Sequence, residues 1–209
     1  AMKIEALEPK AIAKRCRLAF SGLPSDVAGD YETALSKEGL GVFSNAASHR
    51  MDADVPLLIP EVNPDHLELV KKQPAFANGG FIVTNANCST TGLAVPLQAI
   101  YKKFGLSACY VSTYQAVSGA GYPGVPSLDI LGNVVPFIKN EEEKMEEEIH
   151  KMLGAYRNGK LRFAEFDMVA SCARVPVIDG HLESAVLKLG RSADAAAVIK
   201  ALESFKPEP

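Results

Sequence analysis

The chain has 209 residues, of which 47% are hydrophobic, and its formal net charge at pH 7 is −3. This length allows one large hydrophobic core or two small ones. The weak charge and the lack of a dense Lys/Arg cluster argue against a nucleic-acid partner, and no apolar run approaches the about 20 residues of a transmembrane helix. Four scattered cysteines (Cys16, Cys88, Cys109, Cys172) form no metal-ligand pattern. We therefore expect a cytoplasmic protein with reduced thiols, no bound metal and no membrane partner.

The first half of the chain alternates predicted strands with predicted helices. Ser25 or Asp26 can cap a helix that ends near Gly39. Pro56 marks the apolar run 55–59 as an edge or irregular strand. Pro64 suits the first turn of a second helix. This alternation is typical of a parallel α/β sheet. The predicted strands cover residues 17–21, 42–44, 55–59 and 81–84.

The second half has longer strands and an α+β character. The run 106–117 alternates poorly between apolar and polar residues, so we expect both of its faces to be covered. Asp179-Gly180 is a typical hairpin dipeptide and predicts that the two last strands pair with each other. The further strands are predicted at 166–177 and 182–189, and the helices at 93–104, 139–153 and 193–205. We place a domain boundary near residues 84–87.

Cys88 lies where the buried strand 81–84 gives way to a helix. The free N–H groups and the positive end of the helix dipole at such a position favour an anion. This environment lowers the pKa of a thiol and makes it a nucleophile. The alternative is a small buried cysteine in a strand-to-helix turn.

A literal G-x-G-x-x-G occurs at residues 119–124, after a predicted strand. No clear helix starts at its third glycine, Pro123 stiffens it, and the acidic residue expected about 20 positions later is met only by a glutamate run. We therefore interpret it as a loop that needs positive φ angles and close backbone approach, and reject it as a dinucleotide fingerprint.

Several charged residues are candidates for a site, each with a structural alternative. His181 could act as a general acid or base, or it could be a polar turn residue. Arg174, on the facing arm of the predicted hairpin, could hold a carboxylate or lie on the surface. The run 141–148 predicts the solvated face of a helix, on which Glu141 and Lys144 share one side. Met145, Ile149 and Met152 recur at a spacing of three and four and predict the apolar side of the same helix.

Six motifs occur together in one order. They include the string Asn85-Ala86-Asn87-Cys88, and they span residues 43–52, 60–66, 85–92, 113–121, 140–144 and 174–181. In this combination the chain resembles the aspartate-β-semialdehyde dehydrogenase family, in particular its fungal and archaeal branch. The resemblance covers most of the chain from about residue 18 onward.

The resemblance implies an enzyme of amino-acid biosynthesis that uses NADPH to convert L-aspartyl 4-phosphate into L-aspartate 4-semialdehyde and phosphate. It implies that Cys88 forms a thioester, that His181 transfers the proton, and that Gln115 positions the substrate or the thiol. The residues implied to bind substrate are Arg174 for the α-carboxylate, Glu141 for the α-ammonium, and Lys144, Arg50 and Asn87 for the phosphate. Those implied to contact NADP are Ser21, Gly22, Ser118 and Gly119.

The resemblance also implies the domain organisation and the partners. Residues 1–85 would be the remnant of a Rossmann-type dinucleotide-binding domain that lacks its first strand and glycine turn. Residues 86–209 would be a C-terminally incomplete catalytic and dimerisation domain with a mixed sheet, of the glyceraldehyde-3-phosphate-dehydrogenase-like type. We expect a homodimer or a higher homo-oligomer.

Relative to the family, we expect a chain truncated at both ends. The missing glycine turn would anchor the dinucleotide phosphates, so tight NADP binding and efficient turnover are not expected. Two alternatives stay open. The chain could come from a related acyl-phosphate or acyl-CoA reductase of the malonyl-CoA or N-acetylglutamyl-phosphate type, or it could be a catalytically inactive dimerisation fragment.

Overall fold

The computed structural model describes residues 4–206, which divide into two compact units. The first unit comprises the chain up to Ile59, Asn63–Ala86 and Tyr156–Leu161. The second comprises Pro60–Val62, Asn87–Ala155 and the chain from Arg162 onward. Within the described residues, no helix has the length and apolar character needed to cross a membrane.

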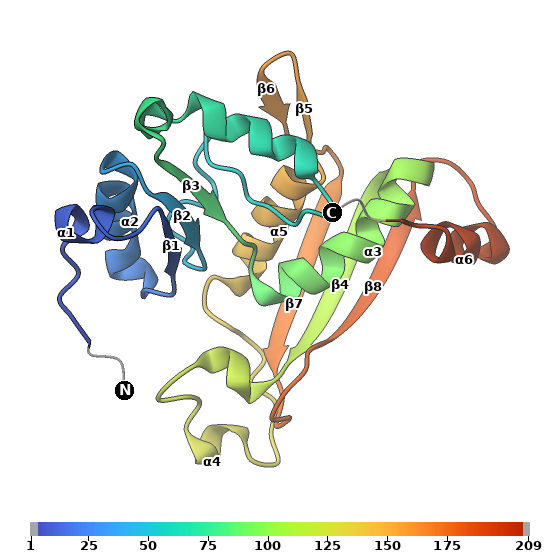
Figure 1. Cartoon of the computed structure of the whole chain (residues 1–209). Coiled ribbons are helices and arrows are strands. Elements are labelled where there is room, and N and C mark those ends of the chain that lie inside the picture. The colour runs from blue at the N-terminus through green and yellow to red at the C-terminus, as the bar shows by residue number, and fades with distance from the viewer. Residues whose placement is uncertain (1–3, 207–209) are drawn as a thin grey trace. The chain divides into compact units, whose positions relative to one another are not determined.

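The first unit is built on a parallel three-stranded sheet in the order β1-β2-β3 (Figure 1). Apolar side chains of α2, β2, β3 and the connecting segments form its core, a cluster of Leu35, Leu40, Val42, Val55 and Ile82. The strands are β1 (Leu18–Ser21), β2 (Gly41–Ser44) and β3 (Phe81–Thr84). The helices are α1 (Pro9–Ala13), α2 (Ser25–Lys37) and the 3-10 helices η1 (Pro64–Lys72) and η2 (Pro74–Asn78).

Two details of this unit bear on the sequence predictions. Helix α2 starts after Pro24 with no side-chain cap, so the predicted cap by Ser25 or Asp26 is wrong. The Ser25 hydroxyl instead accepts the N–H of Ala47, in the loop after β2. The run that contains Pro56 forms only a single bridge to the sheet, between Leu57 and Thr84, as an irregular edge should.

The second unit holds a mixed sheet in the order β7-β4-β8. Strand β4 (Leu106–Gln115) is central, β7 (Asp167–Arg174) is parallel to it, and β8 (Leu182–Leu189) is antiparallel. Helices α3 (Cys88–Phe104) and α5 (Glu141–Met152) pack on the sheet, and α6 (Ala195–Glu203) packs on α3 (Figure 1). The short helices η3 (Val117–Ala120) and α4 (Ser127–Ile130) follow β4. The predicted fold class, a parallel Rossmann-type sheet followed by a mixed sheet, is thereby confirmed.

Two predictions for this sheet are wrong. Strands β7 and β8 do not pair as a hairpin, because β4 lies between them and pairs with both. Nor are both faces of β4 covered, since buried and exposed residues alternate along most of it. Tyr110 and Tyr114 are exposed on its open face. Successive side chains of a strand point to opposite faces, so every second side chain of β4 lies on this face.

One hairpin was overlooked in the sequence. Strands β5 (Ala155–Arg157) and β6 (Lys160–Arg162) pair around Asn158-Gly159, whose φ angles are 51° and 76°. Positive φ at both turn residues is the requirement that Asn-Gly meets best. The dipeptide Asn158-Gly159 therefore indicates this hairpin turn in the sequence.

The glutamate run of α5 is not simply a solvated face. Glu142 and Glu146 accept the N–H groups of Cys172 and Ala170 on β7. The edge strand of a sheet exposes such unpaired groups, and here the helix side chains satisfy them. The opposite side of the helix is apolar, as predicted: Met145, Ile149 and Met152 are fully buried.

Candidate active site

The strand-to-helix junction after β3 presents Cys88 at the first position of α3. Asn87 is the N-cap residue, and its Oδ1 accepts the N–H groups of Ser89 at 2.9 Å and Thr90 at 3.3 Å. Asn is among the best residues for this role because its side chain satisfies helix donors that have no intrahelical acceptor. The Cys88 side chain is exposed, and its Sγ lies 3.2 Å from Nε2 of His181.

The pKa of the Cys88 thiol is raised above its ordinary value, first by burial of the sulfur on its protein side and then by the charge of Glu141. The N–H and hydroxyl of Ser89 act in the opposite direction. The expectation of a lowered pKa from the helix start alone is thus wrong. Burial of the sulfur, together with the charge of the nearby Glu141 carboxylate, outweighs the favourable donors of the helix.

The loop after β4 fixes the ring of His181. Ala116 donates its backbone N–H to Nδ1 over 3.1 Å. That nitrogen therefore carries a lone pair, and in the neutral ring the proton is on Nε2, the atom that faces Cys88. A Cβ at Gly119 would lie 3.0 Å from Nη1 of Arg174 and 3.2 Å from Cε1 of His181. The loop therefore needs glycine for close backbone approach, as predicted.

Gln115, Glu141, Asn87 and Arg174 form one hydrogen-bonded group within the second unit. Oε1 of Glu141 accepts from Nδ2 of Asn87 at 2.9 Å and from Nε2 of Gln115 at 3.2 Å. Nη1 of Arg174 donates to the Ala116 carbonyl at 2.7 Å and, over 3.4 Å, to Oε1 of Gln115. Gln115, Glu141 and Arg174 are all buried, so the structure brings these four predicted site residues together.

Other predicted residues are not joined to this group. Lys144 lies one turn beyond Glu141 on α5, half-buried, and its side chain makes no hydrogen bond or ion pair with another described residue. Arg50 belongs to the first unit, where Nη2 donates to the Asn45 carbonyl at 2.9 Å. Ser118 lies in η3, and its backbone N–H donates to the Ile178 carbonyl.

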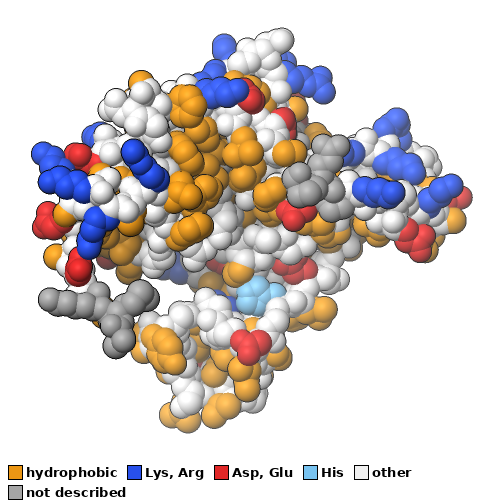
Figure 2. All heavy atoms as spheres, viewed as in Figure 1, with side chains coloured by type: hydrophobic (Ala, Val, Ile, Leu, Met, Phe, Trp, Pro, Cys, Tyr) orange, Lys and Arg blue, Asp and Glu red, His pale blue; other side chains and the backbone are white. Residues whose placement is uncertain are grey.

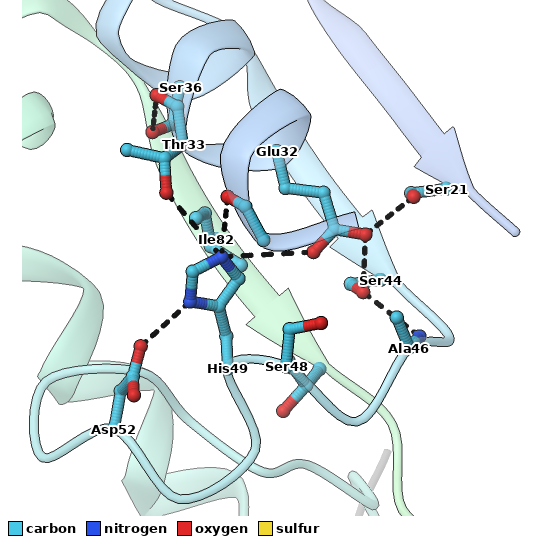
Figure 3. A network of polar contacts seen from close by, with 12 residues as sticks. Ser21, Glu32, Thr33, Ser36, Ser44, Ala46, Ser48, His49, Asp52 and Ile82 are labelled. Carbon is cyan, nitrogen blue, oxygen red and sulfur yellow. Dashed lines mark hydrogen bonds and ion pairs between the residues drawn. The ribbon is translucent and has the colours of Figure 1, made fainter. Parts of the chain in front are cut away.

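The carboxyl end of the parallel sheet in the first unit carries the remaining two predicted residues. Ser21 donates its hydroxyl to Oε1 of the fully buried Glu32 at 2.5 Å, and Ser44 donates to the same oxygen at 2.7 Å (Figure 3). His49 Nε2 lies 4.0 Å from Oε2 of Glu32. Figure 3 shows how these side chains converge from β1, β2, α2 and the loop after β2.

This edge is compatible with a dinucleotide. Ligands of open α/β sheets bind beyond the carboxyl ends of the strands, where Ser21 and Gly22 lie. A Cβ at Gly22 would meet no atom within 4 Å, so the backbone is open to a ligand there. The Ser21 side chain already donates to Glu32. Gly22 therefore fits a backbone contact to NADP better than Ser21 fits a side-chain contact.

Sequence reasoning missed Glu183. Its side chain lines the same cavity as Cys88 and His181, and burial raises the pKa of its carboxyl to about 7. The only signal in the sequence was its place on the predicted strand, two residues after His181 and therefore on the same face. Nothing in the sequence indicated that the carboxylate is buried there.

Two family descriptions match the chain. "Semialdehyde dehydrogenase, NAD binding domain" matches residues 1–70, and "Semialdehyde dehydrogenase, dimerisation domain" matches residues 97–209, which is more than half of the chain. The NAD-binding match covers β1 and β2, and the dimerisation match covers the whole mixed sheet.

Curated relatives and solved structures agree with these matches. Aspartate-semialdehyde dehydrogenase of Archaeoglobus fulgidus is 49% identical over 191 residues, which cover 91% of this chain and 55% of the relative. That of Methanothermobacter thermautotrophicus is 46% identical over 209 residues, 100% of this chain and 60% of the relative. The crystal structure of the Candida albicans enzyme with NADP has a TM-score of 0.89 and 37% identity, and covers 99% of this chain and 60% of that one.

The chain thus spans somewhat more than half the length of the relatives that it matches. The resemblance to archaeal and fungal enzymes predicted from the motifs is confirmed. The chain belongs to the semialdehyde dehydrogenase family, and it is similar over nearly all of its length to the aspartate-semialdehyde dehydrogenases of archaea and fungi.

Proposed function

We propose that this chain carries the catalytic centre of an NADP-dependent enzyme that converts L-aspartyl 4-phosphate into L-aspartate 4-semialdehyde and phosphate. The observation that carries the proposal is the approach of Cys88 Sγ to His181 Nε2 at 3.2 Å, at the start of α3 and beside the group formed by Asn87, Gln115, Glu141 and Arg174. An exposed thiol with an imidazole in hydrogen-bond range is the arrangement of an activated nucleophile.

The first step is acyl transfer to Cys88. The thiolate attacks the acyl carbon, the S–C bond forms, the bond from that carbon to the phosphate oxygen breaks, and phosphate leaves. Nε2–H of His181 faces the sulfur; it stabilises the thiolate as a hydrogen-bond donor and provides the proton when a thiohemiacetal forms. NADPH, when bound, would supply the hydride that reduces the thioester, and NADP would be the oxidised product.

The buried polar group suits a substrate with a free α-amino acid end. In Arg174, Nη1 is engaged by the protein, and Nη2 has no hydrogen-bond partner among the described residues. It is therefore free to bind the α-carboxylate. Glu141 holds its carboxylate in place through Asn87 and Gln115, and would bind the α-ammonium. Lys144, Arg50 and Asn87 are proposed for the phosphate, and Ser21, Gly22, Ser118 and Gly119 for NADP.

A second copy of the chain is the proposed protein partner. The open face of the mixed sheet presents Tyr110, Val169 and Val186, which are neighbours across the strands and at least half exposed. Figure 2 shows further hydrophobic side chains gathered over the α4 segment. Leu128 and Leu131 of this segment are exposed. Exposed apolar surfaces of this kind mark association sites, and the matched description is that of a dimerisation domain.

The cytoplasm is the proposed location. All four cysteines are free thiols, and Cys88 must be reduced to act. Oxidising compartments favour disulfides, whereas the cytoplasm keeps thiols reduced.

The test is acylation of Cys88, because this half-reaction needs no cofactor. The chain is incubated with L-aspartyl 4-phosphate, and phosphate release and the intact mass are followed together. We expect one aspartyl group per chain, bound through a thioester that hydroxylamine removes, and none on Cys88→Ser. Release of phosphate without a mass increase, or an equal adduct on Cys88→Ser, would contradict the proposal.

The same assay separates the related reactions. The relatives named above do not favour a malonyl-CoA or N-acetylglutamyl-phosphate reductase. N-acetylglutamyl phosphate lacks a free α-ammonium, so the Glu141 contact predicts no acylation by it. Faster acylation by this compound than by aspartyl phosphate would reverse the assignment.

A further inference from the structure

Glu183 shares the active-site cavity with the nucleophile. The cavity has a volume of about 470 Å³ and is lined by Cys88, Gly92, Gly180, His181 and Glu183. Glu183 is the second residue of β8, and His181 immediately precedes the strand; both side chains line the cavity. No hydrogen bond or ion pair joins the Glu183 carboxylate to another described residue.

The carboxylate lies beside the helical turn that follows the nucleophile. A Cβ at Gly92 would be 3.5 Å from Oε1 of Glu183. Gly92 is four residues beyond Cys88 in α3, and residues at this spacing lie on one side of a helix, one turn apart. The Glu183 carboxylate therefore lies next to the position that is one helical turn, about 5 Å along the helix axis, from Cys88 on the same side of α3.

The other side of Glu183 is apolar. A second cavity of about 350 Å³ touches it, and eight further residues line that cavity: Gly92, Leu93, Pro96, Leu97, Ile100, Ala185, Leu187 and Leu202. Burial against such surface disfavours the charged form of an unpaired carboxyl group. This is why the pKa of Glu183 is raised to about 7, close to the pH at which the enzyme would work.

We propose that Glu183 is a third titrating group of the active site and that its charge controls the ionisation of Cys88. Neutral Glu183 leaves the thiolate undisturbed, whereas the ionised carboxylate opposes a second negative charge in the cavity. Because Glu183 acts through the thiol and does not itself touch the reacting atoms, it is a positioning residue and not a catalytic one. The inference rests on the proposed role of Cys88, but its test does not require turnover.

The charges around Glu183 come from every element that packs against it. Burial raises the pKa of Cys172 on β7, and the charges of Glu141, Glu142 and Glu183 raise it further. The charge of Glu183 therefore acts across the sheet on Cys172. The ionisable groups are Cys88 on α3, His181 immediately before β8, Cys172 on β7, and Glu141 and Glu142 on α5.

The experiment measures alkylation of Cys88 by iodoacetamide as a function of pH. A Cys16→Ser background leaves Cys88 as the only exposed cysteine, because Cys109 and Cys172 are buried. Glu183→Gln keeps the shape and removes the charge. We expect it to alkylate roughly three- to tenfold faster than its parent at about pH 8, where the parent carries the carboxylate, and within about twofold at about pH 6.

The pH dependence distinguishes charge from structure. A variant that merely loosened the site would change the rate by the same factor at both pH values, and that result would overturn the inference, as would no change at all. Exposed Glu203→Gln on α6 is the matched control and should leave the profile unchanged. If aspartyl phosphate fails to acylate Cys88 while the alkylation profile shifts as stated, the proposed function fails and this inference stands.

Gly92→Ala gives a second test that keeps Glu183. The added methyl group makes ordinary contact with the carboxylate and favours the helix, so the variant should fold. By excluding water from the carboxylate it should raise the pKa of Glu183 further. The pH at which the parent and Glu183→Gln rates diverge should then move upward, and a downward or absent shift would count against the inference.

Discussion

Asn87 and Glu141 are joined by a hydrogen bond of 2.9 Å from Nδ2 to Oε1, while Oδ1 of the same asparagine caps α3. One side chain therefore links the helix that presents the nucleophile to the carboxylate proposed to bind the substrate. The amide supplies both functions because it is a donor at one atom and an acceptor at the other. A change at this position should affect stability and substrate binding separately.

Replacement of Asn87 can separate the two functions. Asn87→Ala removes the cap and should lower the free energy of unfolding by about 1 kcal/mol. Asn87→Asp keeps the capping oxygen, so it should be more stable than the alanine variant, but it places a second carboxylate against Glu141 and should weaken substrate binding at least as much. Urea denaturation and acylation by aspartyl phosphate measure the two effects. Equal stability of the two variants would contradict the capping role.

His181 should control the reactivity of Cys88. Nδ1 accepts from Ala116, so Nε2 is the donor toward the sulfur. His181→Ala removes a hydrogen bond to the thiolate, which is worth about 1.5–3 kcal/mol when one partner is charged. We expect the Cys88 pKa to rise and alkylation at neutral pH to slow by roughly tenfold or more. His150→Ala, which removes a histidine bonded to the Phe166 carbonyl outside this cavity, is the control.

An unchanged alkylation rate in His181→Ala would show that the imidazole does not stabilise the thiolate. Acylation should fall in parallel with alkylation if both depend on the thiolate. A loss of acylation alone would instead place His181 in a later proton transfer.

The sequence predicted the elements that depend on local chemistry. The apolar run of β3, the helix over residues 93–104 and the buried stripe of Met145, Ile149 and Met152 follow from side-chain periodicity and were confirmed. The pairing of β7 and β8 was mispredicted because Asp179-Gly180 reports only the local turn. The insertion of β4 between these strands is a contact between distant parts of the chain.

The candidate site divides in the same way. Family motifs identified Cys88, Gln115, Arg174 and His181 as residues of one site, and the structure brings their side chains into one unit. Glu183 could not be found, because its raised pKa arises from partial burial of the side chain beside α3, and a glutamate on a strand gives no sign of this. The raised pKa of Cys88 was missed for the same reason, since it depends on burial and on Glu141, 53 positions away in the sequence (141 − 88 = 53).

The buried Glu32 should stabilise the first unit. Its Oε1 accepts from Ser21 and Ser44, and Ser44 is itself buried. Glu32→Ala leaves these hydroxyls without their acceptor and should lower the free energy of unfolding by about 2–4 kcal/mol. Glu32→Gln keeps an accepting oxygen and should lose about half as much. Exposed Glu38→Ala at the end of the same helix should stay within about 0.5 kcal/mol of the unchanged chain.

Urea denaturation followed by a probe in the first unit measures these differences. Equal losses for Glu32→Ala and Glu38→Ala would mean that the network of Figure 3 does not stabilise the fold.

The open face of the mixed sheet should form the dimer contact. Val186 lies opposite Tyr110, which in turn lies opposite Val169, and all three are exposed. Burying an unpaired carboxylate in an interface costs several kcal/mol. Val186→Glu should therefore convert a dimer into a monomer at concentrations where the unchanged chain is dimeric. Analytical ultracentrifugation gives the mass directly, against a chain mass of 22.3 kDa.

Val27→Glu provides the matched control, because it makes the same change at an exposed valine of the first unit. It should leave the sedimenting mass unchanged. A dimer that persists in Val186→Glu would place the contact elsewhere, and the apolar α4 segment of Figure 2 would be the next surface to test, through Leu128→Glu. If the unchanged chain is itself a monomer, the proposal that this chain associates with a second copy through an exposed apolar face is wrong.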